Sequence, residues 1–230
     1  MESHDLPAED ISGKMRDYLV EIYRLADRLG SDGEYVSTSA LADLLLVTPP
    51  AVNRMVNRLR SHGLIEHAPY QGIRLTKAGQ REARIRLRGH RIAEVFLVNV
   101  MGFGWETIFD EAQRMSTGLT PALLDRMYEM AGRPQTCPHG EPIPDTDGNL
   151  LPLDDVTLAD AQTGKSLVIT RVTTRESDRL HYLSALGLVP GVELVVHHVA
   201  PFNGPMQLKL HDEYRIIGHN LAEQIRVRSD

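Results

Sequence analysis

The sequence predicts a mainly α-helical protein with a small all-β domain at its C-terminal end. Through most of residues 7–132, apolar side chains recur at three- and four-residue intervals, which is the spacing of amphipathic helices. From Lys165 onward the pattern changes to short runs of Val, Ile and Leu separated by turn residues. A segment rich in Pro and Gly, residues 133–152, separates the two patterns.

Composition limits the class of protein. The chain has 230 residues, of which 42% are hydrophobic, and this length suggests one to three domains. Its apolar runs are shorter than the roughly 20 residues that a membrane-spanning helix needs, so we expect no membrane insertion. The N-terminal sequence MESHDLPAED lacks the pattern of a signal peptide, and the single cysteine, Cys137, excludes an internal disulfide. These features predict a cytoplasmic protein.

The charge is distributed unevenly along the chain. The net charge is −6, yet residues 50–91 contain ten Lys and Arg residues and only two acidic ones, Glu66 and Glu82. Such segregation predicts a cationic face on an acidic body, and therefore a polyanionic partner such as double-stranded DNA.

The N-terminal part predicts three helices. The apolar pattern between Pro7 and Gly30 predicts the first helix, with Gly30 as its terminator. Residues 37–65 then predict two short helices joined by a tight turn. We expect Ser39 to cap the first of these and Thr48 to cap the second, with Gly63 as its stop.

The second short helix has the residue types of a recognition helix. Its polar face contains Asn and Arg, which pair with base edges and phosphates, and residues 64–76 then alternate and turn like a two-stranded wing. We therefore predict a winged helix-turn-helix; the alternative is a polar surface pair of helices. Base readout is assigned to Thr48, Pro50, Asn53, Arg54 and Asn57, and phosphate contacts to Ser37, Ser39, Arg58, Arg60, Tyr70 and Arg74.

A long helix is predicted over residues 77–101, cationic in its first half and apolar in its second. His90 and Glu94 lie at the junction, four residues apart, so a helix places both on one face, close enough to share an ion. The alternative is a core helix with a solvated basic end. Two shorter helices follow, and their apolar residues exceed what a monomer can bury. This excess predicts a homodimer that binds a palindromic site.

The remaining residues predict a small barrel of about five strands, with a short helix over residues 179–188. Cys137 and His139, two apart in the Pro- and Gly-rich segment, have a spacing that lets both bind one metal ion. We divide the chain into a DNA-binding domain (1–76), a helical dimerisation and metal-binding domain (77–151) and a barrel (152–230).

Five segments in this order, DYLVEIY, TPPAVNRMVNRLRSHGLI, GHRIAEVFL, FDEAQRM and CPHGEPIP, make the chain resemble the diphtheria toxin repressor family, including its manganese-transport branch. The resemblance covers nearly the whole length. It implies a winged helix, a helical dimerisation domain and a barrel of the Src-homology or iron-transport-accessory type. It further implies a dimeric repressor of metal-uptake genes that binds DNA when loaded with Mn(II) or Fe(II), and it implies no enzyme activity.

The resemblance also implies metal ligands. His90, Glu94, Cys137 and His139 match the auxiliary site of this family, and Glu176, or else Asp178, matches its acidic barrel ligand. Phe109 stands where some members have a further histidine. In the primary site Asp17 matches, whereas the other positions are Gln113, Ser116 and Thr117, which are poor ligands. We therefore predict a dominant site at His90 and Glu94, and a weak one at Asp17 and Gln113.

The predicted metal is Mn(II), because Asp17 resembles the manganese branch. Fe(II) and Zn(II) are alternatives, and the general order of affinities favours zinc. Three other functions compete with this one. The chain could be a metal-independent regulator that responds to a small molecule or a partner protein, a metallohydrolase, or a protein whose barrel docks weakly on another protein such as a transporter. The sequence contains no His-Glu-x-x-His motif, which argues against the hydrolase.

Overall fold

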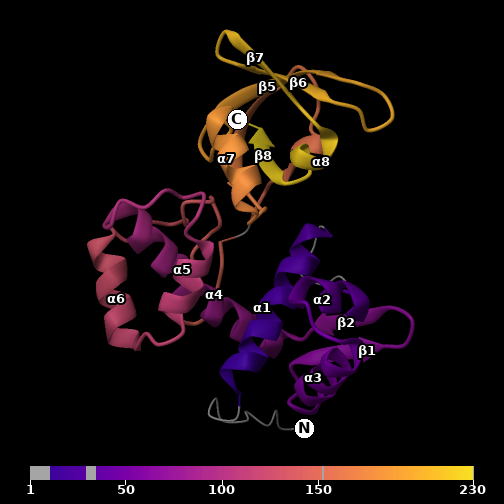
Figure 1. The fold of residues 1–230 in the computed structure, drawn as a ribbon, viewed down its shortest axis with the longest axis vertical. Helices are drawn as coiled ribbons and strands as arrows, with labels where there is room; N and C mark the ends of the chain where they lie inside the picture. The colour runs from indigo at the N-terminus through magenta and orange to yellow at the C-terminus, as the bar shows by residue number, and fades with distance from the viewer. Residues whose placement is uncertain (1–10, 30–34, 152, 230) are drawn as a thin grey trace. The chain divides into compact units, whose positions relative to one another are not determined.

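The structure is a computed structural model that describes residues 11–29, 35–151 and 153–229. It consists of two compact units. Figure 1 shows the course of the chain and the labelled elements. The first contains the chain up to Arg88 together with Pro144–Asn149, and the second contains Gly89–Ile143 and the chain from Leu150 onward. The three-domain division at residues 76 and 151 stays a prediction.

The first unit contains the predicted winged helix-turn-helix. Its elements are α1 (Gly13–Arg28), α2 (Thr38–Leu45), α3 (Pro49–Ser61), β1 (Ile65–Ala68), β2 (Gly72–Leu75) and the first half of α4 (Lys77–Asn99). The apolar side of α1 is buried, as its periodicity predicts. Gly30, the expected terminator of the first helix, lies outside the described residues.

The cap of α2 differs from the prediction. Ser37, and not Ser39, is the N-cap residue, and its hydroxyl accepts a hydrogen bond of 3.0 Å from the backbone N–H of Ala40. The prediction was wrong because the helix begins at Thr38, two residues earlier than the apolar pattern indicates. Thr48 does occupy the N-cap position of α3, with Pro49 in its first turn, and Gly63 follows the helix with a φ of 68°.

We expect Ser37→Ala to lower the free energy of unfolding by about 1 kcal/mol, because one N–H of the first turn of α2 loses its partner. Ser39→Ala is the matched control and should change it by less than about 0.5 kcal/mol. Urea denaturation measures the free energy of unfolding of both variants. Equal losses in the two would contradict the assignment of Ser37 as the N-cap.

The wing is the antiparallel hairpin of β1 and β2, in which Ile65 pairs with Leu75 and Ala68 with Gly72. Gly72 has a φ of 116°, and a Cβ atom there would lie 2.3 Å from the carbonyl oxygen of Val36. This position therefore requires glycine, since only glycine permits both the backbone angle and the close approach. The contact joins the wing to the segment before α2.

The second unit begins with the apolar half of α4. Two helices, α5 (Phe109–Ser116) and α6 (Pro121–Met130), follow it, as the sequence predicts. A core of Ile92, Ala93, Leu97, Ile108, Ala112 and Met127 holds the three together. Several large apolar side chains of this helical part stay exposed, namely Val100, Met101, Phe103, Leu123 and Met130.

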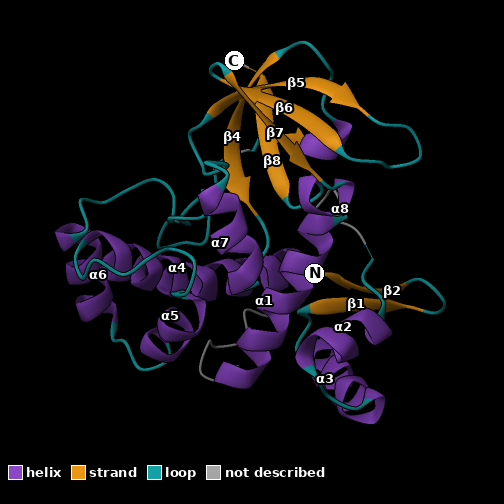
Figure 2. Cartoon of the chain, turned by 45° about the horizontal axis from the view of Figure 1, so that its top comes forward, coloured by secondary structure: helices purple, strands orange, loops and turns teal. Residues whose placement is uncertain are grey.

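The C-terminal part of this unit contains an antiparallel sheet (Figure 2). The order of its strands is β3-β8-β4-β5-β6-β7. Its strands are β3 (Val156–Thr157), β4 (Ser166–Val172), β5 (Glu193–Val199), β6 (Met206–Leu210), β7 (Glu213–Ile217) and β8 (Ile225–Ser229). The sixth strand, β3, has only two residues, which is too short for a recognisable pattern. Irregular register in β4 and β5 bends the sheet.

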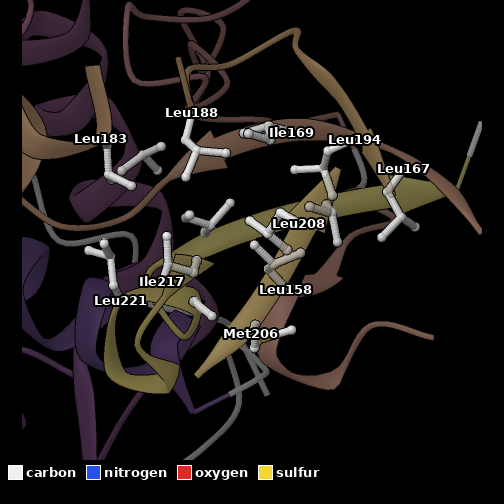
Figure 3. Packing of buried hydrophobic residues seen from close by; sticks show 14 of the residues in the cluster. Leu158, Leu167, Ile169, Leu183, Leu188, Leu194, Met206, Leu208, Ile217 and Leu221 are labelled. Atoms are coloured by element: carbon white, nitrogen blue, oxygen red, sulfur yellow. The ribbon is translucent and has the colours of Figure 1, made fainter. Parts of the chain in front are cut away.

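The barrel core is almost entirely aliphatic (Figure 3). Alternate residues of the strands, such as Leu167 and Ile169 on β4, point into it. One side is closed by α7 (Ser177–Ala185), the predicted short helix, and by α8 (His219–Ala222) and a 3-10 turn (Leu158–Asp160). Among the described residues, none of the helices has both the length and the apolar composition that crossing a bilayer requires.

Candidate metal centre and DNA-binding surface

A cluster of potential metal ligands is buried in the second unit. Glu94 on α4 meets Cys137 and His139 from the Pro- and Gly-rich loop, and one ligand atom of each lies within 4.8 Å of the others. Nε2 of His90, one turn earlier on α4, is 3.2 Å from Oε1 of Glu94. All four residues are buried. The structure thus brings together three of the four residues predicted to bind metal at this site, with His90 in contact with Glu94. Cys137 and His139 belong to the Pro- and Gly-rich loop with the sequence Cys137-Pro138-His139, called here the CPH loop.

His139 is oriented by a backbone carbonyl. Its Nε2 lies 2.9 Å from the carbonyl oxygen of Trp105, while its Nδ1 lies 3.5 Å from Oε1 of Glu94. When Nε2 donates to that carbonyl, the lone pair of Nδ1 faces the cluster. Metal-binding histidines are typically held this way, by a hydrogen bond from the second ring nitrogen. No sequence pattern indicates this role of Trp105, the single tryptophan of the chain.

The environment of the cluster shifts the pKa of Glu94 and that of Cys137 in opposite directions. Burial alone would raise the pKa of Glu94, but His90 and His139 lower it well below its usual range. Burial raises the pKa of the Cys137 thiol well above its usual value, and the charge of Glu94 raises it further. A divalent cation would oppose the effect on Cys137, since it stabilises the thiolate, and it would favour the ionised carboxylate of Glu94 further.

The donor set fits a transition metal. Two imidazoles, one carboxylate and one thiol are ligands that bind Zn(II), Fe(II) or Mn(II) at about 2.0–2.3 Å. Ligand atoms that surround one ion at this distance lie roughly 3–4 Å apart, and the distances in the cluster are close to this range. Small side-chain movements therefore suffice to enclose an ion.

Backbone hydrogen bonds and Gly140 shape the CPH loop. The backbone N–H of Cys137 donates to the carbonyl of Glu141, and that of Gly140 donates to the carbonyl of Cys137, which closes a tight turn. Gly140 has a φ of 83°, and a Cβ atom there would lie 2.0 Å from the carbonyl oxygen of Thr170 on β4. The loop consequently packs directly on the barrel, where Val172 donates to the carbonyl of His139.

We expect Gly140→Ala to destabilise the protein and to lower its affinity for metal. The backbone at this position is already left-handed, a conformation that costs a residue with a Cβ about 1–2 kcal/mol, and the clash of the methyl group with β4 costs about 1–3 kcal/mol more. Gly164→Ala is the matched control, because Gly164 has a φ of 79° but open space where its Cβ would lie. Thermal unfolding and a metal-competition titration measure both effects. Equal destabilisation of the two variants would contradict the close packing of loop and barrel.

The other predicted residues of the auxiliary site lie outside the cluster. Phe109 contacts the ring of His90 at 4.8 Å between centroids, and the guanidinium of Arg175 lies 4.6 Å from the centre of its ring. Glu176 and Asp178 are exposed at the start of α7, where Glu176 pairs with Arg179 at 2.7 Å. Neither belongs to the cluster formed by the described residues. A barrel carboxylate as a ligand therefore stays a prediction.

The residues of the predicted weak site belong to different units. Asp17 on α1 accepts a hydrogen bond of 3.1 Å from Nε of Arg86, so an arginine already neutralises its charge. The backbone carbonyl of Gln113 accepts hydrogen bonds from the hydroxyls of Ser116 and Thr117. Weak metal binding at Asp17 and Gln113 stays a prediction.

The residues assigned to DNA binding lie mostly on the polar face that the sequence predicts. Val52, Val56 and Leu59 are buried beneath α3. Arg74 differs from the others in the wing, since it is half-buried, pairs with Glu66 and lies over the ring of Tyr35. The remaining assigned residues are exposed: Ser37, Ser39, Thr48, Pro50, Asn53, Arg54, Asn57, Arg58, Arg60 and Tyr70.

Comparison with known proteins covers almost the whole chain. Residues 10–73 match the N-terminal DNA-binding domain of iron-dependent repressors, residues 76–145 match their metal-binding and dimerisation domain, and residues 156–229 match the FeoA domain. The iron-dependent repressor IdeR of Mycobacterium leprae is 26% identical over 222 residues, which is 91% of this chain and 94% of that protein.

Solved structures agree with this. The crystal structure of T. acidophilum IdeR is 31% identical, with a TM-score of 0.82, and the match covers 94% of this chain and 97% of that one. A manganese-dependent transcriptional repressor in complex with manganese is 27% identical, with a TM-score of 0.83, over 94% of this chain and 100% of that one. The chain therefore belongs to the iron-dependent, or diphtheria toxin, repressor family of metal-dependent transcriptional regulators.

Proposed function

We propose that this protein represses transcription as a homodimer that binds a palindromic operator. A divalent metal at His90, Glu94, Cys137 and His139 raises its affinity for that operator. The observation that carries the proposal is the buried cluster of Glu94, Cys137 and His139, because a carboxylate, a thiol and an imidazole converge there from two segments. We infer that the regulated genes include those for uptake of the same metal, as the resemblance implies.

The chain's own residues suggest how the site acts on DNA. Glu94 and His90 belong to α4, the same helix that begins directly after the wing, whereas Cys137 and His139 belong to a loop that packs on the barrel. His90, Glu94, Cys137 and His139 would hold a divalent cation, whose positive charge would stabilise the carboxylate and the thiolate together. The ligands then hold the loop against α4, and a fixed α4 limits the orientations of the winged helix that precedes it.

The homodimer is inferred from exposed apolar surface. Met101, Phe103, Leu123 and Met130 lie in the helical part that matches a dimerisation domain, and each is about half exposed. A second copy that covers them would remove this surface from water. A dimer also presents two recognition helices at a fixed spacing, which is what a palindromic operator requires.

Mn(II) is the metal we propose. The donor set alone would favour Zn(II) by the general order of affinities, so metal availability must decide between them. Support for manganese comes from the match to a repressor that was solved with manganese and from the aspartate at position 17, which resembles the manganese branch.

Anomalous scattering at the manganese edge, from crystals grown with Mn(II), tests the site directly. We expect the strongest peak among Glu94, Cys137 and His139, and a weaker peak or none beside Asp17. A strong peak at Asp17 alone would overturn the assignment of the dominant site. Chelator-treated protein that contains no metal and binds the operator as tightly as metal-loaded protein would instead favour the metal-independent regulator.

A further inference from the structure

A chain of buried charges runs through the second unit beside the metal cluster. Nη2 of Arg91 on α4 lies 2.8 Å from Oε2 of Glu141, and Nη1 of Arg171 on β4 lies 3.3 Å from Oε1 of the same carboxylate. Arg171 continues the chain, since its Nε and Nη2 form hydrogen bonds of 3.0 and 3.1 Å with the two oxygens of Asp155. Four charged side chains thus connect α4, the CPH loop and the barrel.

Glu141 is the central member of this chain, and it belongs to the loop. It lies two residues after His139, and its backbone carbonyl accepts a hydrogen bond of 2.8 Å from the N–H of Cys137. Each of its two carboxylate oxygens faces a different arginine, so one side chain joins the helix to the sheet. The two arginines are almost completely buried, at 4% and 3% exposure.

The members of the chain adjoin the metal ligands in sequence and in space. Arg91 follows His90 directly, and its Nη1 also donates to the carbonyl of Pro142 at 2.6 Å. Arg171 precedes Val172, whose N–H donates to the carbonyl of His139 at 2.8 Å. A displacement of Cys137 or His139 therefore displaces Glu141, and through Glu141 it reaches both arginines.

Stability alone is a poor explanation for these charges. Desolvation of buried ions largely cancels their attraction, so well-packed apolar residues of similar volume often serve as well or better. Buried ion pairs do, however, fix one geometry, because each charge accepts only a partner of opposite sign at hydrogen-bonding distance.

We propose that Glu141 is a positioning residue that transmits the state of the metal centre to the barrel. Its carboxylate holds Arg91 and Arg171 at once, so that closure of the CPH loop on α4 also tightens β4 and the Asp155 segment. The inference rests on the proposed function, because it assumes that metal binds at Glu94, Cys137 and His139. Glu141 itself does not bind the metal.

The test measures the hydrogen-exchange rates of the backbone amides of β4 in the full-length protein, with and without saturating Mn(II). In the wild-type chain we expect Mn(II) to slow exchange in β4 by about 5–150-fold, the usual range of coupling between sites. In Glu141→Gln the slowing should fall below about twofold, although the protein still retains Mn(II), because the neutral amide cannot hold two guanidinium groups. Retention is measured by metal analysis of the dialysed protein.

The control and the second variant separate positioning from folding. Glu129 also pairs with two arginines, Arg126 and Arg133, but on the exposed surface. In the control variant Glu129→Gln, Mn(II) should therefore slow hydrogen exchange in β4 as much as in the wild type. Glu141→Asp keeps the charge but is too short to reach both arginines. We expect it to fold, to retain Mn(II) and to lose the slowing in β4, even if Glu141→Gln does not fold.

Two results would overturn the proposal, and they differ in what else they remove. If either Glu141 variant retains Mn(II), and Mn(II) slows its hydrogen exchange in β4 as much as in the wild type, the positioning role is wrong but the proposed metal centre stands. If the wild-type chain itself retains no Mn(II), the proposed function fails together with this inference.

Discussion

Glu94→Gln is expected to abolish the response of operator binding to metal. Coupling between two sites usually amounts to about 1–3 kcal/mol, or 5–150-fold in affinity, and we expect less than about a twofold response in the variant. The physical reason is that Glu94 is the one carboxylate of the cluster and touches both imidazoles, at 3.2 and 3.5 Å. A neutral amide is a much weaker ligand for a divalent cation.

Fluorescence anisotropy of a labelled operator, titrated with Mn(II), measures this effect. Glu111→Gln is the matched control, since Glu111 lies exposed on α5, where it pairs with the exposed Arg114. Adding His139→Ala to Glu94→Gln should reduce the response no further, because both residues belong to one site. A metal response of wild-type size in the double variant would refute the assignment of the centre.

The second large effect is expected from Arg54→Ala, which should weaken operator binding by about 1–3 kcal/mol. Arg54 is exposed in the N-terminal half of α3, where recognition helices contact base edges, and its guanidinium can pair with guanine in two places. The loss should therefore depend on a single base pair. It should largely disappear in an operator in which that base pair is changed.

Arg60→Ala is the comparison for this prediction. Arg60 lies in the last turn of α3 and is assigned to phosphate contacts. Its loss should therefore weaken binding to all sequences alike and reduce the slope of log affinity against log salt concentration by about one. Binding measured on a set of singly substituted operators at several salt concentrations separates the two residues. A loss for Arg54→Ala that is uniform over the set would move Arg54 to the phosphate class.

Much of the fold could be predicted because its local signals agree with its tertiary packing. Pro49 after Thr48 and Gly63 after the apolar stripe fix the bounds of α3, and turn residues such as Pro190-Gly191 separate the strands. The cap of α2 was misplaced because Ser37 and Ser39 are both good N-cap residues, and only the backbone selects one. β3 was missed because two residues contain no periodicity.

The metal cluster could be predicted only in part. His90 and Glu94 lie on one face of the helix because they are four residues apart, so helix formation alone brings them together. Their approach to Cys137 and His139 depends on Gly140 lying against Thr170, a contact between segments thirty residues apart that no local pattern encodes. The partnership of Glu141 with Arg91 and Arg171 is hidden for the same reason.

The central claim is that a metal ion at this centre controls the affinity of the protein for its DNA operator. The most direct measurement is the operator affinity of the wild-type dimer, first stripped of every divalent cation and then reloaded with Mn(II), at one fixed salt concentration. We predict that reloading tightens binding by about 5–150-fold and that the Glu94→Gln variant stays at the stripped level. Equal affinity of the stripped and reloaded wild-type protein would contradict the account.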